Sequence, residues 1–357
     1  METEDRLAML KNRTDAELEK FFKSKIKQVK NDNKPKELME IIESLEKFTL
    51  NSGKRIRPIL FYFGYIVGGG KDKPEALKAS ISIELIHSYL LIHDDIIDRD
   101  NFRHGNFSMH YSYAKKSEND FKDIDSKHFG ISMAIIAGDM ASALGYEILT
   151  NSNFSIDLKI KAIEKLNQIV SNTVAGEALD VVLVEYPNVE IKRICEMQKY
   201  KTAKYTIEGP LQLGAILAGA NKDFLDSLSR FAIPAGIAFQ IQDDIIGIFG
   251  NEKKIGKPVG SDIKEGKKTL LFAKALEKAS DAQRRILNSS LGNKKININD
   301  IDRVRDIITK TGSLEFSINK AKELTEGAKK SLNDLETSEE NKKFLNNLAD
   351  FVVQRKY

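Results

Sequence analysis

The sequence predicts an all-α fold, and three observations support this prediction. Proline is scarce, with 7 of 357 residues, or about 2% against a usual share near 5%. Apolar residues recur at helical spacing, as Ile83, Ile86, Leu90 and Ile97 do. No stretch of useful length alternates apolar and polar residues in the way that is typical of a strand.

Residues 1–50 are predicted to form two polar amphipathic helices, separated by a break near residues 29–36 that is rich in Lys, Asn and Asp. Residues 51–57 predict a basic loop, and an apolar helical segment at 58–67 ends at three consecutive glycines. A longer helix is predicted from about Pro74 to Asp98, and it becomes acidic towards its C-terminal end.

Two polar connections interrupt the middle of the chain. Residues 99–129 form the first, with one short helix around 107–116, and the glycine- and lysine-rich residues 250–269 form the second. Five apolar helices are predicted, at 130–150, 156–185, 190–202, 203–220 and 222–249.

Residues 270–357 also show helical spacing, with breaks near Gly292 and Gly312. No linker rich in proline, glycine and serine divides the chain, and no repeat of fixed period is visible. Hydrophobic residues make up 41% and charged residues 30% of the chain, as is usual for globular proteins. We therefore expect residues 1–357 to form one large helical domain.

Charge, cysteine content and hydropathy exclude several classes of protein. The 56 basic and 52 acidic residues give a net charge of +4, too small an excess to indicate a nucleic-acid partner. The single cysteine, Cys195, excludes an internal disulfide framework and a Cys-rich zinc site. The start of the chain lacks the apolar stretch of a signal peptide. The uncharged runs at 58–70 and 209–221 are shorter than the roughly 18 residues of a membrane span, so we expect a cytoplasmic protein.

Three carboxylates end the predicted helix at 74–98. Asp94 and Asp98 are four residues apart and share one helix face, and Asp95 lies beside them. Carboxylates at a helix C-terminus repel one another and oppose the helix dipole. A cation would compensate them, and hard oxygen ligands suit Mg²⁺. The alternative for such a motif alone is a solvated acidic helix end.

A second aspartate pair, Asp243 and Asp244, interrupts another apolar helix within FQIQDDIIGIFG. Charged pairs suit a dry core poorly. Both pairs are explained if they face one cavity that holds metal. Cations in loops are the usual partners of phosphate, so carboxylates, Mg²⁺ and cations together favour a polyphosphate ligand. The candidate cations are Lys54, Arg57, Arg103, Lys201, Lys257, Lys267 and Lys268.

The sequence resembles the trans-isoprenyl diphosphate synthases, the family of the farnesyl and geranylgeranyl diphosphate synthases. The resemblance covers about residues 45–275 and keeps the order of seven motifs. These are GKRIRP, HDDIID with a following arginine, AGD at 137–139, GEALD at 176–180, KTAKY, FQIQDD and GKPVGSDIKEGKK. It implies an all-α bundle around a central cavity, the isoprenoid synthase fold, and a homodimer.

The resemblance also implies roles for individual residues. Asp94, Asp95 and Asp98 would bind Mg²⁺ that bridges to an allylic diphosphate, and Asp243 and Asp244 would hold a third Mg²⁺. The implied diphosphate contacts are Arg103, Lys201 and Lys257 for the allylic substrate, and Lys54, Arg57, His87 and His104 for isopentenyl diphosphate. Lys267 is a further candidate for substrate binding. The implied catalytic set near the reacting carbons is Lys201, Thr202 and Gln240.

Three positions depart from the family pattern. His104 stands where a second arginine is common, Gly247 where the second motif often ends in Asp, and Glu177 where Gln is frequent. Gly247 leaves one metal ligand fewer, which Asp262 or a water could replace. Family members with the Gly and Glu variants are active, so we expect the reaction to be kept.

The implied reaction is head-to-tail prenyl transfer. The allylic diphosphate ionises with help from Mg²⁺ and the cations, and the allylic cation attacks the double bond of isopentenyl diphosphate. Tyr89, Leu90 and Ile86 lie before the first motif and are candidates to limit chain length, although Tyr89 could be plain core packing. We expect geranylgeranyl diphosphate as the product, with farnesyl diphosphate as the alternative.

Three rival functions are weaker. A terpene cyclase binds one diphosphate and needs neither the loop of Lys54 and Arg57 nor a second aspartate pair. A non-catalytic partner subunit would be expected to lose carboxylates that this chain keeps. A Ca²⁺-binding helical protein would place its aspartates in a 12-residue loop.

Overall fold

The computed structural model describes residues 3–51, 53–103, 105–250 and 260–353, and in these ranges it confirms the all-α prediction. The one exception is a two-residue hairpin, in which β1 (Phe102–Arg103) pairs antiparallel with β2 (Asn106–Phe107). The helices are α1 Thr3–Asn31, α2 Lys36–Leu50, α3 Ile56–Val67, α4 Lys73–Ile97, α5 Met109–Asp120, α6 Ser126–Thr150, α7 Ile156–Glu185, α8 Ile191–Gln198, η1 Lys199–Glu208, α9 Gly209–Leu217, α10 Lys222–Phe249, α12 Ser261–Glu265, α13 Leu270–Lys278, α14 Asp281–Ser290, α15 Ile298–Lys310, α16 Ser313–Ser331, η2 Leu332–Asp334 and α17 Glu339–Val353.

The chain divides into two compact units. Unit 1 comprises Met1–Glu164 and Leu213–Ala220, and unit 2 comprises Lys165–Gln212 and Asn221–Tyr357. The organisation of residues 1–357 as one domain stays a prediction.

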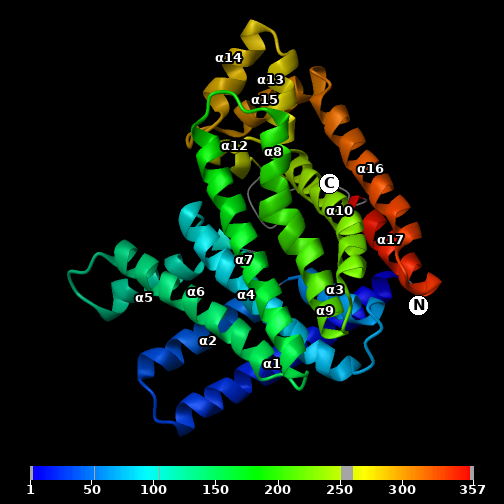
Figure 1. Ribbon diagram of the computed structural model, residues 1–357. Coiled ribbons are helices and arrows are strands. Elements are labelled where there is room, and N and C mark those ends of the chain that lie inside the picture. Colours follow the sequence, from blue (N-terminus) through cyan, green and yellow to red (C-terminus); the bar gives the residue numbers. More distant parts are fainter. Residues whose placement is uncertain (1–2, 52, 104, 251–259, 354–357) are drawn as a thin grey trace. The chain divides into compact units, whose positions relative to one another are not determined.

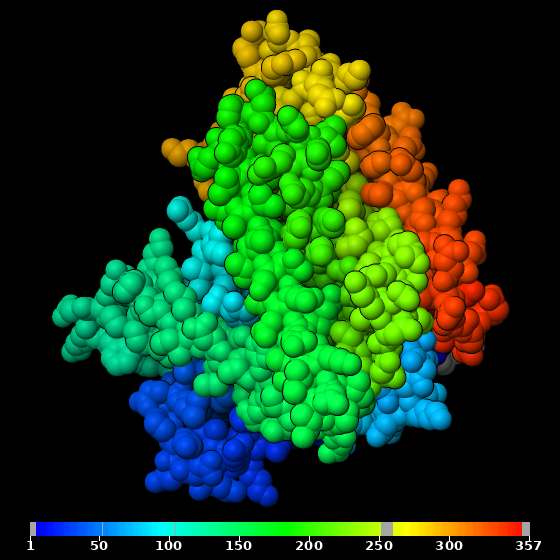
Figure 2. Space-filling model, viewed as in Figure 1, coloured from blue at the N-terminus to red at the C-terminus, as the bar shows by residue number. Residues whose placement is uncertain are grey.

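In unit 1, α4 packs against α3 and α6, and α1 and α2 contribute to the same core (Figure 1). Phe22, Leu45, Leu85 and Ile92 are fully buried there. In the space-filling view the teal surface of α5 adjoins the dark-blue surface of α2 (Figure 2), where Lys116 Nζ lies 2.7 Å from Glu40 Oε2. The helix that ends in the first aspartate motif is therefore anchored in the hydrophobic core of unit 1.

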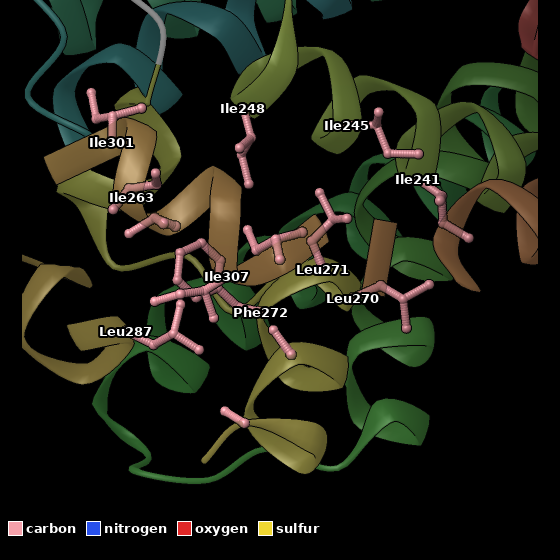
Figure 3. Close-up of a cluster of buried hydrophobic side chains, with 14 of the residues drawn as sticks. Ile241, Ile245, Ile248, Ile263, Leu270, Leu271, Phe272, Leu287, Ile301 and Ile307 are labelled. Carbon is pink, nitrogen blue, oxygen red and sulfur yellow. The ribbon is translucent and has the colours of Figure 1, made fainter. Parts of the chain in front are cut away.

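In unit 2, α10 runs beside α16 and also contacts η1 (Figure 1). Ile241, Ile245 and Ile248 project from α10 towards a cluster that includes Leu271 and Phe272 of α13 (Figure 3). These isoleucines follow the helical spacing i, i+4, i+7, so one apolar stripe of α10 is buried. Burying this stripe fixes the rotation of the helix that carries the second aspartate pair.

The region around KTAKY differs from the prediction of separate helices at 190–202 and 203–220. The chain passes from α8 into η1, a π-helix of 10 residues, and continues into α9 without leaving helical geometry. The predicted boundary at 202–203 is wrong, because η1 runs across it. Gly176 and Gly236 let neighbouring helices approach η1 closely at this point. A Cβ on Gly176 would lie 2.2 Å from Lys201 N, and one on Gly236 would lie 2.5 Å from Ala203 Cα.

The other boundaries agree with the prediction within a few residues, with two differences. The basic segment 51–57 is a loop only as far as Arg55, since α3 begins at Ile56. The connection 250–269 contains the short helix α12, between Gly260 and Gly266, which both have positive φ.

Two helices, α6 and α10, are long and apolar enough to cross a membrane. This is weak support for a span, because core helices of soluble proteins pass the same test. In α10 the apolar stripe is part of the core of unit 2.

Candidate active site

The first group of predicted site residues lies at the C-terminal end of α4. The helix stops there because Arg99 adopts a left-handed conformation with φ of 60°, while Asp98 N still donates to Asp94 O at 2.8 Å. Asp95 is fully buried, and Asp94 and Asp98 are half-buried. The predicted clustering of the three carboxylates on one helix end is therefore present.

Arg103, on β1, neutralises two of these carboxylates. Its Nε donates to Asp95 Oδ1 at 2.6 Å, and its Nη2 donates to Asp94 Oδ2 at 3.0 Å. Burial would lower the pKa of Arg103, but the Asp95 and Asp94 carboxylates outweigh burial and raise it above its usual value. The arginine predicted to bind phosphate is thus held directly beside the carboxylates predicted to bind metal.

Two of the residues predicted to contact isopentenyl diphosphate, Arg57 and His87, lie beside each other in unit 1. Arg57, in the first turn of α3, has its Nη1 3.0 Å from Nε2 of His87 on α4. A guanidinium has no acceptor, so His87 Nε2 must accept and its proton must reside on Nδ1. Lys54 is exposed in the loop just before α3.

The second aspartate pair lies on α10 in unit 2, and its two members have different surroundings. Asp244 is 7% exposed, and both of its carboxylate oxygens accept hydrogen bonds from amides. Gln198 Nε2 donates to Oδ2 at 3.0 Å, and Gln240 Nε2 donates to Oδ1 at 2.7 Å. Thr202 Oγ1 donates to Gln240 Oε1 at 2.6 Å, so the predicted catalytic pair is connected to Asp244. Asp243 is half-buried.

Several carboxylates surround Asp244. Burial raises the pKa of Asp244 well above its usual value, and the nearby Asp262, Asp243 and Asp180 carboxylates raise it further, against a lowering hydrogen bond from Gln240. A cation placed among these groups would relieve this repulsion. The donor set is made of hard carboxylate oxygens, which fits Mg²⁺.

Lys201 pairs with the GEALD motif of α7. Its Nζ lies 2.8 Å from Glu177 Oε2 and 2.6 Å from Asp180 Oδ2. Lys267 lies 3.0 Å from Glu265 and 4.0 Å from the same Asp180. These two predicted cations of unit 2 are therefore both paired with carboxylates.

Gly247, the departure in the second motif, lies directly beside Asp262. A Cβ built on Gly247 would lie 2.8 Å from Asp262 Oδ2, and Gly260 N donates to Gly247 O at 3.1 Å. The Asp262 carboxylate thus occupies the space next to the position where the family often has an aspartate.

The three candidate chain-length residues lie on α4. The Tyr89 ring packs edge-to-face on His93 at 4.8 Å, and His93 uses space left by Gly138 of α6. Ile86 is fully buried against Gly145, also of α6. Leu90 is half-buried. Their roles in chain length stay predictions.

Two predicted site residues, His104 and Lys257, lie outside the described residues. Sequence reasoning did not single out Gln198, which holds Asp244, or Asp180, although Asp180 belongs to a motif that was recognised. It also left out Arg55, between Lys54 and Arg57. The only available signal for these residues was proximity in sequence to a motif.

The chain is similar to known prenyl diphosphate synthases in sequence and in structure. The family model described as polyprenyl synthetase matches residues 37–308. A geranylgeranyl diphosphate synthase of Saccharolobus solfataricus is 34% identical over 85% of this chain and 87% of its own length. A geranylfarnesyl diphosphate synthase of Aeropyrum pernix is 32% identical over 85% of this chain and 90% of its own length.

Among solved structures, a geranylgeranyl pyrophosphate synthase of Corynebacterium glutamicum, complexed with isoprenyl diphosphate and magnesium, has a TM-score of 0.91. It is 30% identical, and the match covers 100% of both chains. The family match spans far more than half of the sequence and includes both acidic helices. The chain belongs to the polyprenyl synthetase family.

Proposed function

We propose that this protein is a Mg²⁺-dependent prenyltransferase that condenses isopentenyl diphosphate with an allylic diphosphate. The observation that carries the proposal is the group of Asp94, Asp95 and Arg103, in which two carboxylates predicted to bind metal lie within hydrogen-bond distance of a cation predicted to bind phosphate. The relatives named as geranylgeranyl diphosphate synthases support it.

We propose three Mg²⁺ ions. Asp94, Asp95 and Asp98 of α4 and Asp243 and Asp244 of α10 would be their ligands. Bound Mg²⁺ supplies Lewis-acid stabilisation of the diphosphate charge. We include Asp262 as an additional ligand in the position left open by Gly247.

The cations would bind the substrates. Arg103, Lys201, Lys257 and Lys267 would contact the allylic diphosphate, with Arg103 exchanging its carboxylate partners for phosphate. Lys54, Arg57, His87 and His104 would contact isopentenyl diphosphate. A guanidinium can bind a diphosphate through two parallel hydrogen bonds, which fixes its orientation as well as its charge.

The remaining residues would guide the allylic cation. Thr202 and Gln240 carry oxygen dipoles that are ordered by the hydrogen bonds to each other and to Asp244. Preorganised dipoles stabilise developing charge without reorganisation during the reaction. Apolar side chains around the reacting carbons would exclude water, which otherwise quenches the cation.

We propose geranylgeranyl diphosphate as the product, supported by the names of the relatives. Farnesyl diphosphate stays the alternative. The relative named as a geranylfarnesyl diphosphate synthase has a name that denotes a longer product.

We also propose a cytoplasmic homodimer with no nucleic-acid partner. Ile135 and Ile136 of α6, which are 43% and 48% exposed, support a partner surface.

A product assay tests the proposal. Purified protein, Mg²⁺ and labelled isopentenyl diphosphate are incubated with dimethylallyl, geranyl or farnesyl diphosphate, and the dephosphorylated products are sized by chromatography. A main product of 20 carbons is the expected result. No elongation with any starter would favour the non-catalytic partner subunit, whereas a cyclic product from farnesyl diphosphate alone would favour a terpene cyclase.

A further inference from the structure

A buried arginine connects the loop before α3 to α1 and α4. Arg55, whose side chain is 3% exposed, donates from Nε to Asp15 Oδ1 at 2.7 Å and from Nη1 to Glu84 Oε1 at 2.6 Å. Asp15 belongs to α1 and Glu84 to α4. One guanidinium therefore connects the loop to two helices that are distant in sequence.

The backbone of the loop is shaped around this contact. Arg55 has φ of 52°, in the left-handed region that non-glycine residues rarely adopt. Gly53 has φ of 141°, and a Cβ there would lie 2.8 Å from Arg55 Nη1. Only glycine at position 53 leaves room for the arginine, so loop conformation and ion pairs depend on each other.

One face of α4 contacts the loop and the two helices that it joins, α2 and α3. Glu84 binds Arg55, His87 lies 3.0 Å from Arg57, and Ser88 Oγ lies 2.9 Å from Thr49 Oγ1 at the end of α2. Residues three and four apart share a helix face. The loop thus follows α4, with Arg55 turned inwards and Lys54 exposed.

We propose that Arg55 is a positioning residue, which sets Lys54 and Arg57 for isopentenyl diphosphate through its ion pairs with Asp15 and Glu84. The inference rests on the proposed function, because it takes that substrate as the ligand of Lys54 and Arg57. Arg55 itself is buried and does not touch the substrate. Losing it should weaken binding of isopentenyl diphosphate and leave the allylic substrate unaffected.

The experiment must separate positioning from stability. Arg55→Met alone leaves the Glu84 carboxylate buried, and its Oε2 already lacks a hydrogen-bond partner among the described residues, so this variant should be unstable. Replacing both partners by apolar residues is often nearly neutral for stability. The double variant Arg55→Met/Glu84→Met should therefore recover the melting temperature, and Asp15 keeps its pairing with Lys11 at 2.7 Å.

Binding of isopentenyl diphosphate by calorimetry and the KM values for both substrates are measured for wild type, the single variant and the double variant. We expect the double variant to fold and to keep Kd and KM for isopentenyl diphosphate raised about tenfold or more, with the allylic KM within about twofold. Arg55→Lys keeps the charge but not the forked geometry, and it should raise the same constants to a smaller degree. If the double variant fails to fold, Arg55→Lys is the variant that tests the inference.

The matched control is another ion pair of unit 1. Lys25 of α1 lies 2.7 Å from Glu147 of α6, and Lys25→Met/Glu147→Met should leave the isopentenyl diphosphate constants unchanged. Wild-type constants in the folded Arg55→Met/Glu84→Met or Arg55→Lys variant would overturn the inference and leave the proposed function intact. A wild-type protein that fails to bind isopentenyl diphosphate would overturn both.

Discussion

Replacing Gly247 by alanine should alter the metal requirement without unfolding the protein. The new Cβ would lie 2.8 Å from Asp262 Oδ2, whereas ordinary contacts begin at 3.4 Å, so the Asp262 carboxylate must withdraw. The backbone cannot easily give way instead, because Gly247 O accepts the hydrogen bond of Gly260 N. The substitution thus displaces one carboxylate of the group around Asp244.

The expected magnitudes differ for stability and for metal. Alanine in place of glycine inside a helix contributes about 1 kcal/mol of stability, which offsets the local displacement, so the melting temperature should stay near that of wild type. Disturbing a supporting metal ligand typically lowers metal affinity about 10- to 100-fold. The Mg²⁺ concentration for half-maximal rate should rise by a comparable factor.

Two assays measure this effect. The first is prenyl transfer as a function of Mg²⁺ concentration, and the second is the Mg²⁺-dependent shift in melting temperature, which needs no turnover. Gly327→Ala in α16 is the matched control, because a Cβ there meets nothing within 4 Å. It should gain similar stability and keep the wild-type Mg²⁺ dependence. An unchanged Mg²⁺ dependence in Gly247→Ala would refute the role assigned to Asp262.

Three further predictions concern single residues. Asp94→Ala should lower the rate by several orders of magnitude, and near-normal turnover would contradict the metal assignment. Tyr89→Ala should lengthen the product if Tyr89 limits the chain, which chromatography of the products would show, and an unchanged distribution would assign Tyr89 to packing against His93. In chelator, the raised pKa of Asp244 means that the folded state binds more protons than the unfolded state, so the free energy of unfolding should fall as pH rises above about 3.8. Asp244→Asn should reduce this slope in pH-dependent thermal melts, and an unaltered slope would show that other groups cause it.

Helix positions were largely predictable because the apolar periodicity is strong. α7 and α10 begin and end where the pattern indicates. The π-helical stretch η1 was not predictable from spacing, and it packs closely on Gly176 and Gly236, which are distant from it in sequence. Local spacing contains no information about such contacts.

The candidate site was predictable in its residue types and less so in its bonding. The acidic motifs identified Asp94 and Asp95, and the structure shows that Arg103 neutralises both. Arg55 is buried, although it lies between two cations predicted to bind substrate, Lys54 and Arg57. The sequence of basic residues alone did not predict this burial. It depends on a left-handed backbone and on Asp15 and Glu84, which only the folded chain brings near.

The π-helix η1 makes the protein sensitive to the deletion of a single residue between 199 and 208. Lys201 and Thr202 are adjacent, yet Lys201 binds carboxylates of α7 and Thr202 binds Gln240 of α10. A π-helix bonds each residue one position further along than an α-helix does, so removing one residue between 199 and 208 would allow the stretch to relax into an α-helix. The helix would survive such a deletion, but the side chains within the stretch would change their angular spacing. A single-residue deletion in this stretch would therefore disturb its contacts with α7 and with α10 at the same time.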